Sequence, residues 1–340
     1  MNLPKFKYLA PNSLKEACEA LKEYNGLIGI CAGGTELVMH LKWGLKAPDY
    51  LLSLKNLIEL RKLRYDDNLG FVLGAMVSLR NLAGSAHIKS ELVALSEAAE
   101  AVASPQIRNM ATIGGNVSLD TRCWYYDRSK QWRTTFPPCY KDGGAHCYMV
   151  KGGKQCYALF MADTVPSLLI LRAKLKLVHS DGEYILPIEE FYTGLGKTPN
   201  RMNKDEILTE INIPKLPPYS GTVYLKYSNR AVLNFPVIGF ASLVRLNGEG
   251  KFCQEARFAL TGIKSKPILI DATKLLKGLD EPILNEDQIK YLLQEVRPIT
   301  HMGVSSSLKR IIIRVLLRKA FHDSWRMAQK SRTDSFSMRK

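Results

Sequence analysis

Two pairs of adjacent glycines constrain the fold of this 340-residue chain more than any other feature of its sequence. Gly33-Gly34 follows the apolar run 27–32 and precedes a short helical pattern. Gly114-Gly115 lies in the segment 108–120, shortly after an alanine-rich helical pattern at 91–103. Adjacent glycines permit backbone conformations that side chains forbid, and successions of strand, turn and helix build α/β folds. The sequence therefore predicts two successive α/β units.

The other apolar patterns predict a further domain after these units. Short apolar runs predict strands, and apolar residues at helical spacing predict helices. Before residue 215 they give helices at 13–24 and 91–103 and strands at 27–32, 50–54, 71–75, 168–171 and 174–179. A boundary is expected in the proline-containing segment 215–220. Beyond it they give an α+β arrangement, with strands at 224–228, 237–246 and 256–261 and helices at 271–277, 286–296 and 306–321.

Both glycine pairs are candidate anion-binding loops. Glycines after a strand let backbone N–H groups approach a phosphate without interference from a Cβ atom. Neither pair matches the GxGxxG fingerprint or a Gly-Lys-Ser/Thr loop, and a plain turn explains either one alone at least as well. Two such loops in successive units favour the pyrophosphate of a dinucleotide, because each can hold part of an extended ligand. The candidate segments are 30–36 and 112–116.

Four of the seven cysteines lie in or beside the segment 121–155, which has no sustained strand or helix period. Irregular segments longer than about 15 residues are uncommon inside a compact domain, so something other than regular hydrogen bonding must order this one. Four thiolates can ligate Zn²⁺ or a [4Fe–4S] cluster. The wide spacing, with no CxxC pair, favours the cluster over zinc and over four unrelated thiols. The candidate ligands are Cys123, Cys139, Cys147 and Cys156.

The formal net charge of +16 is uneven, because half of the excess lies in residues 309–340. A basic terminus can bind nucleic acid, an anionic membrane surface or an acidic partner, or it can stay solvated. No nucleic-acid recognition motif accompanies it, so we expect no nucleic-acid function. A basic zinc-binding nucleic-acid protein is the rival class, and it predicts zinc and no flavin. No stretch approaches the ~20 apolar residues of a membrane span, and the N-terminus is not that of a secreted protein. A cytoplasmic location without membrane attachment is expected.

Several short motifs, in their order and spacing, resemble the FAD-binding medium subunit of the xanthine dehydrogenase family of molybdenum hydroxylases. They are Phe6 to Pro11, AGGTEL at 32–37, TIGGN at 112–116, Ala162-Asp163, the segments 205–208 and 211–214, and Leu225-Lys226 with Arg230. Most family members run directly from TIGGN to the segment that begins at Asp163, whereas this chain inserts residues 121–160 there. The insert most resembles that of 4-hydroxybenzoyl-CoA reductase β subunits, which carries a [4Fe–4S] cluster. Aldehyde oxidoreductases of the family can also carry a cluster, with a less similar cysteine loop.

The resemblance implies a PCMH-type FAD-binding fold. Residues 1–216 would form the FAD-binding domain, with two α/β subdomains at about 1–55 and 56–216 and the cysteine-bearing insert at 121–160. Residues 217–325 would form the α+β C-terminal domain, and residues 326–340 a basic tail. The implied FAD contacts are Ile30, Cys31, Ala32, Gly33, Gly34, Thr35, Glu36, Thr112, Gly114, Gly115, Asn116, Asp163, Leu208 and Lys226.

The resemblance also implies a role in a larger assembly. The partners would be a large molybdopterin subunit, which binds the substrate, and a small subunit with [2Fe–2S] clusters, arranged as a dimer of heterotrimers. Reduced ferredoxin would deliver electrons at the insert for the reductive removal of a phenolic hydroxyl, and no catalytic residue is expected in this chain. Another hydroxylase or aldehyde oxidoreductase of the family, with electrons flowing the other way, is the alternative.

Overall fold

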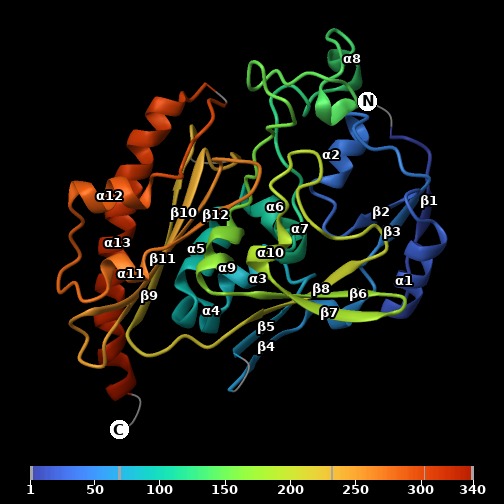
Figure 1. Cartoon of the computed structure of the whole chain (residues 1–340). Helices are drawn as coiled ribbons and strands as arrows, with labels where there is room; N and C mark the ends of the chain where they lie inside the picture. Colours follow the sequence, from blue (N-terminus) through green and yellow to red (C-terminus); the bar gives the residue numbers. More distant parts are fainter. Residues whose placement is uncertain (1–2, 68–69, 231–232, 302, 338–340) are drawn as a thin grey trace.

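The computed structural model describes residues 3–67, 70–230, 233–301 and 303–337, with side chains described to residue 331. Three sheets are arranged across the molecule, with helices between and beside them (Figure 1). This mixed architecture, with two N-terminal units of helices and strands followed by an α+β C-terminal part, confirms the predicted fold class.

The first unit is a small parallel sheet with two helices, as its glycine turn predicts. Its sheet has the order β1-β3-β2, and both strand pairs are parallel. Helix α1 begins after Ser13, whose hydroxyl accepts a hydrogen bond from the Glu16 N–H. The elements are β1 (Lys7–Leu9), α1 (Leu14–Glu23), β2 (Ile28–Cys31), α2 (Leu37–Lys42) and β3 (Tyr50–Ser53).

The second unit joins an antiparallel sheet to a layer of short helices. The sheet order is β4-β5-β8-β6-β7. Its strands are β4 (Leu63–Asp66), β5 (Gly70–Gly74), β6 (Lys174–His179), β7 (Gly182–Pro187) and β8 (Ile207–Ile213). Its helices are η1 (Ile58–Arg61), α3 (Leu79–Gly84), α4 (Ala86–Glu91), α5 (Val93–Glu100), α6 (Pro105–Met110), α7 (Ile113–Val117), α9 (Thr164–Ile170) and α10 (Ile188–Phe191).

The segment predicted as a strand at 168–171 is helical instead, so that prediction is wrong. It belongs to α9, in which every residue is buried. An apolar run that is buried on all sides has no polar face to reveal its period, and a short run of this kind does not distinguish a helix from a strand. The predicted helix at 91–103 is likewise divided, because α4 ends at Glu91 and α5 begins at Val93.

The C-terminal part is a four-stranded antiparallel sheet between two helical layers. Its order is β12-β11-β10-β9, and α13 packs across β9 and β10. Tyr224, Ala241 and Ala259 join the core of the second unit on the opposite face, so the two parts share one hydrophobic core. The elements are β9 (Ser220–Tyr227), β10 (Ile238–Leu246), β11 (Cys253–Thr261), β12 (Ile268–Asp271), α11 (Thr273–Leu276), α12 (Glu286–Leu292) and α13 (Ser306–Ser337).

Helix α13 continues well beyond residue 321, where the sequence prediction ended it, and through the predicted start of a separate tail at 326. Phe321, Trp325 and Ala328 are buried and follow helical spacing against the sheet. The backbone of β9 approaches this helix at Gly221, where a Cβ atom would lie 2.0 Å from the Ser324 carbonyl oxygen. Among the described residues, no helix is both long enough and apolar enough to span a membrane.

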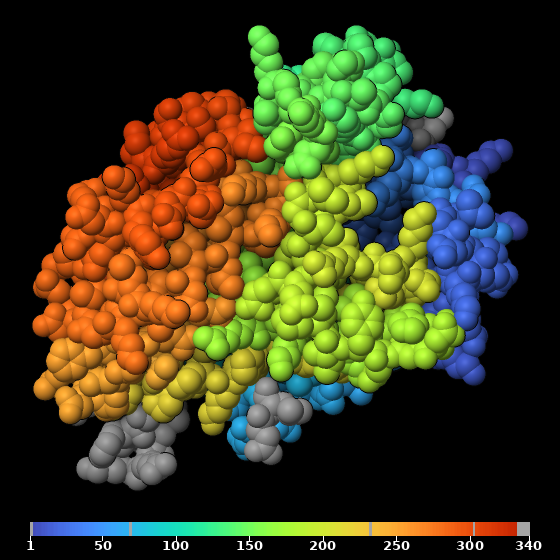
Figure 2. Space-filling model, in the orientation of Figure 1, coloured from blue at the N-terminus to red at the C-terminus, as the bar shows by residue number. Residues whose placement is uncertain are grey.

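The insert forms a lobe above α2, seen in green in Figures 1 and 2. Apart from α8 (Lys130–Arg133) and η2 (Tyr140–Asp142), its described residues form no helix or strand. At its base, Arg122 and Leu159 exchange two backbone hydrogen bonds of 2.7 and 2.8 Å. Farther out, Lys130 N–H and the Arg133 guanidinium donate to carbonyl oxygens of Trp43 and Gly44 after α2. The lobe is therefore attached both to the second unit and to the first.

Candidate functional site

A cavity of about 860 Å³ opens between the first unit, the second unit and the start of the C-terminal part. Figure 2 shows the surface hollowed between the blue N-terminal residues and the yellow-green segment near residue 200. Twelve of the fourteen predicted cofactor contacts line it: Ile30, Ala32, Gly33, Gly34, Thr35, Glu36, Thr112, Gly114, Gly115, Asn116, Asp163 and Leu208. Cys31 and Lys226 do not line the cavity, although both lie close to residues that do.

The first glycine loop packs directly on the chain that leads into the second. A Cβ atom on Gly33 would lie 1.9 Å from the carbonyl oxygen of Met110, which is impossible without moving backbone. Gly34 has a φ of +72°, in the left-handed region that glycine adopts without a steric penalty. The two loops therefore meet only because these two positions are glycine.

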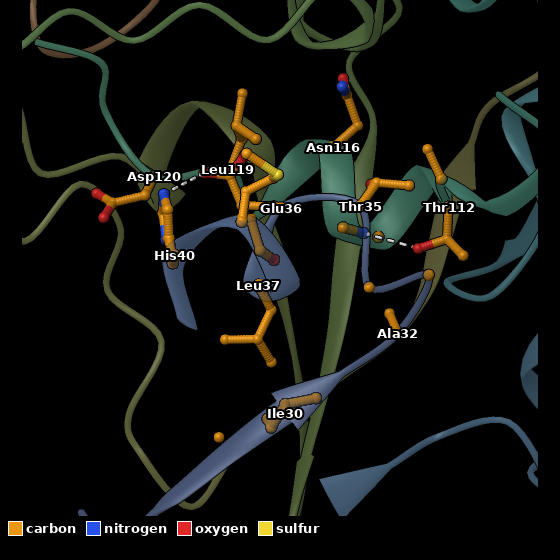
Figure 3. Close-up of a pocket in the computed structure, with 18 of the residues that line it drawn as sticks. Ile30, Ala32, Thr35, Glu36, Leu37, His40, Thr112, Asn116, Leu119 and Asp120 are labelled. Atoms are coloured by element: carbon orange, nitrogen blue, oxygen red, sulfur yellow. Dashed lines mark hydrogen bonds and ion pairs between the residues drawn. The ribbon is translucent and has the colours of Figure 1, made fainter. Parts of the chain in front are cut away.

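The second glycine loop is fixed by the end of β5 and by its own threonine. A Cβ atom on Gly114 would lie 2.7 Å from the Ala75 side chain, so this position also requires glycine. Thr112 Oγ1 accepts a hydrogen bond of 3.1 Å from the Gly115 N–H (Figure 3). Asn116 Oδ1 accepts from both the N–H and the hydroxyl of Thr164, which fastens the loop to α9. Hydrogen bonds and close packing within the protein therefore hold this loop in place.

A buried carboxylate connects the cavity wall to the C-terminal sheet. Asp163 Oδ1 accepts a hydrogen bond of 2.7 Å from the Tyr224 hydroxyl and lies 3.1 Å from Lys226 Nζ. Burial raises the pKa of Asp163 to about 6, against the opposing effects of Lys226 and Tyr224. Lys226 also donates to the carbonyl oxygens of Ala101 and Asn234. Lys226 thus acts on the cavity through Asp163.

Glu36 forms the centre of a charged cluster that sequence reasoning missed. Its carboxylate pairs with the Arg122 guanidinium and lies 3.1 Å from His40 Nε2. The His40 side chain is 2% exposed, and burial lowers its pKa. A dashed line in Figure 3 marks the ion pair of Glu36 and His40, and within the described residues neither ring nitrogen of His40 has a partner that meets hydrogen-bond geometry. No local pattern links these residues, because Glu36 and Arg122 are 86 positions apart.

The four predicted ligand cysteines are brought into one neighbourhood, all as free thiols. Burial, with a smaller contribution from nearby Cys156, raises the pKa of Cys123 to about 12. Burial also raises the pKa of Cys156, and nearby Cys139 and Cys147 add to that effect. Cys139 pairs with His146 across an isolated bridge, which draws it towards Cys147. Electrostatic influence thus connects all four sulfur atoms through Cys156.

These thiols are not gathered tightly enough to hold a single metal ion. In the described part of the chain, no three His, Cys, Asp or Glu side chains form such a group. Thiolates on one tetrahedral zinc ion would lie about 3.8 Å apart, given a Zn–S distance of about 2.3 Å. Sulfur ligands of a [4Fe–4S] cube bind different iron atoms and are held farther apart.

Two family models together account for nearly the whole chain. Residues 4–216 match the FAD-binding domain in molybdopterin dehydrogenase. Residues 223–324 match the C-terminal domain of the CO dehydrogenase flavoprotein. The first match covers more than half of the sequence and includes both glycine loops.

Individual relatives agree with these matches. The chain is 29% identical over 283 residues to the FAD-binding subunit PaoB of an aldehyde oxidoreductase from Escherichia coli K12, covering 78% of this chain and 84% of that one. It is 27% identical over 325 residues to the medium chain of glyceraldehyde dehydrogenase from Sulfolobus acidocaldarius, covering 94% and 98%.

Solved structures show the same fold. A chain of carbon monoxide dehydrogenase from Hydrogenophaga pseudoflava superimposes with a TM-score of 0.76 at 22% identity, over 96% of this chain and 99% of that one. A chain of quinoline 2-oxidoreductase from Pseudomonas putida 86 gives 0.74 at 20% identity, over 97% and 100%. The glycine-lined cavity and the family matches lead to one conclusion: this protein belongs to the FAD-binding medium subunits of the molybdenum hydroxylase family and is an oxidoreductase subunit with an FAD-binding domain.

Proposed function

We propose that this chain carries electrons between an external donor or acceptor and a molybdenum subunit, through FAD in the cavity and a [4Fe–4S] cluster on the insert. The observation that carries the proposal is the cavity itself. Both of its glycine loops are closely packed: a side chain at Gly33 would collide with the Met110 backbone, and one at Gly114 would collide with Ala75. Flavin exchanges electrons singly or in pairs, and the protein supplies binding, orientation and electrostatics.

The residues around the cavity have distinct proposed roles. The loops 30–36 and 112–116 hold the pyrophosphate, because both line the cavity and glycine-containing loops let backbone N–H groups approach an anionic ligand. Asp163 and Leu208 also line the cavity and contact the cofactor there. Lys226 serves by fixing Asp163, and Cys31 by packing behind Gly34, rather than by contacting the cofactor.

The cluster proposal rests on the insert. Its thiols influence one another through Cys156, while its described backbone forms only two short helical turns. A segment with so little regular structure gains order from metal ligation, which contributes directly to folding. Cys123, Cys139, Cys147 and Cys156 are the proposed ligands. We propose that ferredoxin exchanges electrons with the cluster at this site.

We further propose that the chain works beside a large molybdopterin subunit and a small [2Fe–2S] subunit, in a dimer of heterotrimers. Relatives are named as medium chains or subunits of complexes, as in carbon monoxide dehydrogenase from Hydrogenophaga pseudoflava. The substrate would bind in the large subunit, because we expect no residue of this chain to contact the substrate.

For the overall reaction we favour reduction of 4-hydroxybenzoyl-CoA, because the insert resembles that of this reductase. The reaction consumes two electrons and two protons, releases the phenolic oxygen as water and leaves benzoyl-CoA. The electrons come from two molecules of reduced ferredoxin, the named co-reactant. Aldehyde oxidation is the second candidate, supported by 29% identity to a subunit of an aldehyde oxidoreductase.

The test is an assay of the complete complex purified without oxygen. Reduced ferredoxin with 4-hydroxybenzoyl-CoA should bleach the flavin absorbance and then form benzoyl-CoA. Oxidation of aromatic aldehydes, without any reduction of the thioester, would instead assign the second candidate. A complex purified without flavin would overturn both.

A further inference from the structure

We propose that Arg122 couples occupancy of the flavin cavity to metal loading of the insert. This inference rests on the proposed function, which puts FAD in the cavity and a cluster on the cysteines. Arg122 lines the cavity, and the next residue in the chain is the proposed ligand Cys123. It would be a positioning residue, because its side chain acts on both sites through its neighbours.

On the cavity side, the Arg122 guanidinium contacts two cavity-lining residues from distant parts of the chain. It pairs with the Glu36 carboxylate of the first glycine loop. It also lies over the ring of Phe235, 4.3 Å from the centroid, in a cation–π contact. The orientation of the guanidinium therefore fixes both Glu36 and Phe235.

On the insert side, the same residue is held by backbone and by a second carboxylate. Arg122 exchanges two backbone hydrogen bonds with Leu159 where the insert leaves and rejoins the fold. Asp127 Oδ2 accepts a hydrogen bond of 2.9 Å from Cys123 N–H and lies 4.0 Å from Arg122 Nη1. Any rearrangement that brings Cys123 onto a cluster therefore acts on the contacts of Arg122.

Burial makes this arrangement cooperative. The Arg122 side chain is 11% exposed, and within the described residues its Nε has no hydrogen-bond partner. Moving the guanidinium would leave Glu36 and Asp127 without their counter-charge, and partly buried charges tolerate such separation poorly. Metal loading should fix the insert, Arg122 and then the Glu36 loop before flavin binds. By linkage, bound flavin should stabilise the cluster by the same free energy.

His40 extends the cluster towards the ligand. It lines the cavity, and it shares Glu36 with Arg122 while its ring nitrogens have no hydrogen-bond partner in the described structure. A cofactor in the cavity can supply that partner. Glu36 is thus the residue through which Arg122 and the cavity occupant influence each other.

A double-mutant cycle tests the coupling. The full chain is purified anaerobically as wild type, Cys139→Ala, Arg122→Gln and the double variant, and FAD affinity is measured by fluorescence titration of the FAD-free forms. Cys139 does not line the cavity, so its removal acts through the cluster. When Arg122 is present, Cys139→Ala should weaken FAD binding about tenfold, which is within the usual range of coupling between two sites. With Arg122→Gln, the same change should matter by less than about twofold.

Two further variants keep the test decisive. Glu36→Gln keeps the shape of Glu36 but removes its charge, so it should also abolish the effect of Cys139→Ala, even if Arg122→Gln folds poorly. Lys151→Gln is the control background, because it removes one positive charge from an exposed position of the insert. In this background, Cys139→Ala should still weaken FAD binding about tenfold.

The outcomes separate the coupling from the proposed function. An effect of Cys139→Ala that is unchanged in both the Arg122→Gln and Glu36→Gln backgrounds, or absent in wild type, overturns the coupling but leaves the two cofactors in place. A wild-type chain that binds no FAD or no iron overturns the proposed function, and the coupling with it.

Discussion

The glycines of the two cavity loops matter because they have no Cβ atom. Gly33 allows the first loop to touch the Met110 carbonyl, and Gly114 allows the second to touch Ala75 at the end of β5. Thr112, by contrast, contributes through its side chain, because its hydroxyl accepts a hydrogen bond from the Gly115 N–H. The cavity wall is thus built from contacts that any larger residue at positions 33 and 114 would prevent.

A Gly33→Ala variant should lose FAD. The added methyl group would lie 1.9 Å from the Met110 oxygen, so the two loops must separate and the cavity must change shape. We expect FAD affinity to fall by more than about tenfold, equivalent to at least about 1.4 kcal/mol. Gly84→Ala is the matched control, because a Cβ there meets nothing within 4 Å. Full flavin occupancy in Gly33→Ala, measured by absorbance after denaturation, would contradict the loop geometry.

Asp163 should give the FAD-free chain a specific pH dependence. Its pKa is raised from 3.8 to about 6 in the folded state, so between these values the folded chain binds more protons than the unfolded chain. Its contribution to stability is therefore lost as pH rises from about 4 to about 6. The stability of wild type relative to Asp163→Asn should fall over this range and then level off. Chemical denaturation at several pH values measures the difference, and a rise over the same range would refute the raised pKa.

At the scale of elements, sequence patterns predict an element well where it has one buried and one polar face. Helix α1 and strand β6, in which buried and exposed positions alternate at the period of the element, lie close to their predicted positions. Strands β2, β3, β5 and β10 also lie close to prediction although β5 is buried throughout, because apolar runs of this length are typical of buried strands. Helix α9 was predicted as a strand because all of its residues are buried. The charged cluster of Glu36, His40 and Arg122 could not be predicted, because its members meet only through tertiary packing.

Helix α13 should contribute to stability through its far end as well as its beginning. The Trp325 side chain is 1% exposed and contacts Phe321 edge-on at 5.7 Å between ring centroids. Trp325→Ala should lower the free energy of unfolding by about 3–5 kcal/mol. Ile311, on the same helix, is 61% exposed. Ile311→Ala should therefore change the free energy of unfolding by less than about 0.5 kcal/mol. Equal effects in urea denaturation would mean that α13 does not pack as described beyond residue 321.

On the scale of the whole molecule, the cavity exists because three parts of the chain meet around it. The sheet β9–β12 shares a core with α5 and α9 on one face and packs against α13 on the other. The glycine loops predicted from the sequence line this cavity, whereas the ligand predicted for the four cysteines stays a prediction. The shared core depends on long-range contacts between α5 and β9, such as the hydrogen bond from the Tyr224 N–H to the Glu97 carboxylate, for which the sequence has no local signal.

The chain should unfold as one cooperative unit even when no metal is bound to the insert. Tyr224, Ala241 and Ala259 of the C-terminal sheet lie in the same core as the helices of the second unit. Loss of either part would expose that core, so calorimetry should give a single transition whose midpoint rises with FAD concentration. Two transitions, with only one of them sensitive to FAD, would show that the domains unfold separately.

We propose above all that one chain binds both FAD and a [4Fe–4S] cluster. The most direct test of this proposal is the content of FAD, iron, acid-labile sulfide and zinc in anaerobically purified protein. We predict FAD with about four iron and four sulfide per chain, the composition of one cube. Cys139→Ala should lose the iron and sulfide, whereas Cys253→Ala, which changes a buried cysteine of the C-terminal core, should keep both. Stoichiometric zinc without sulfide, or full iron content in Cys139→Ala, would contradict the account.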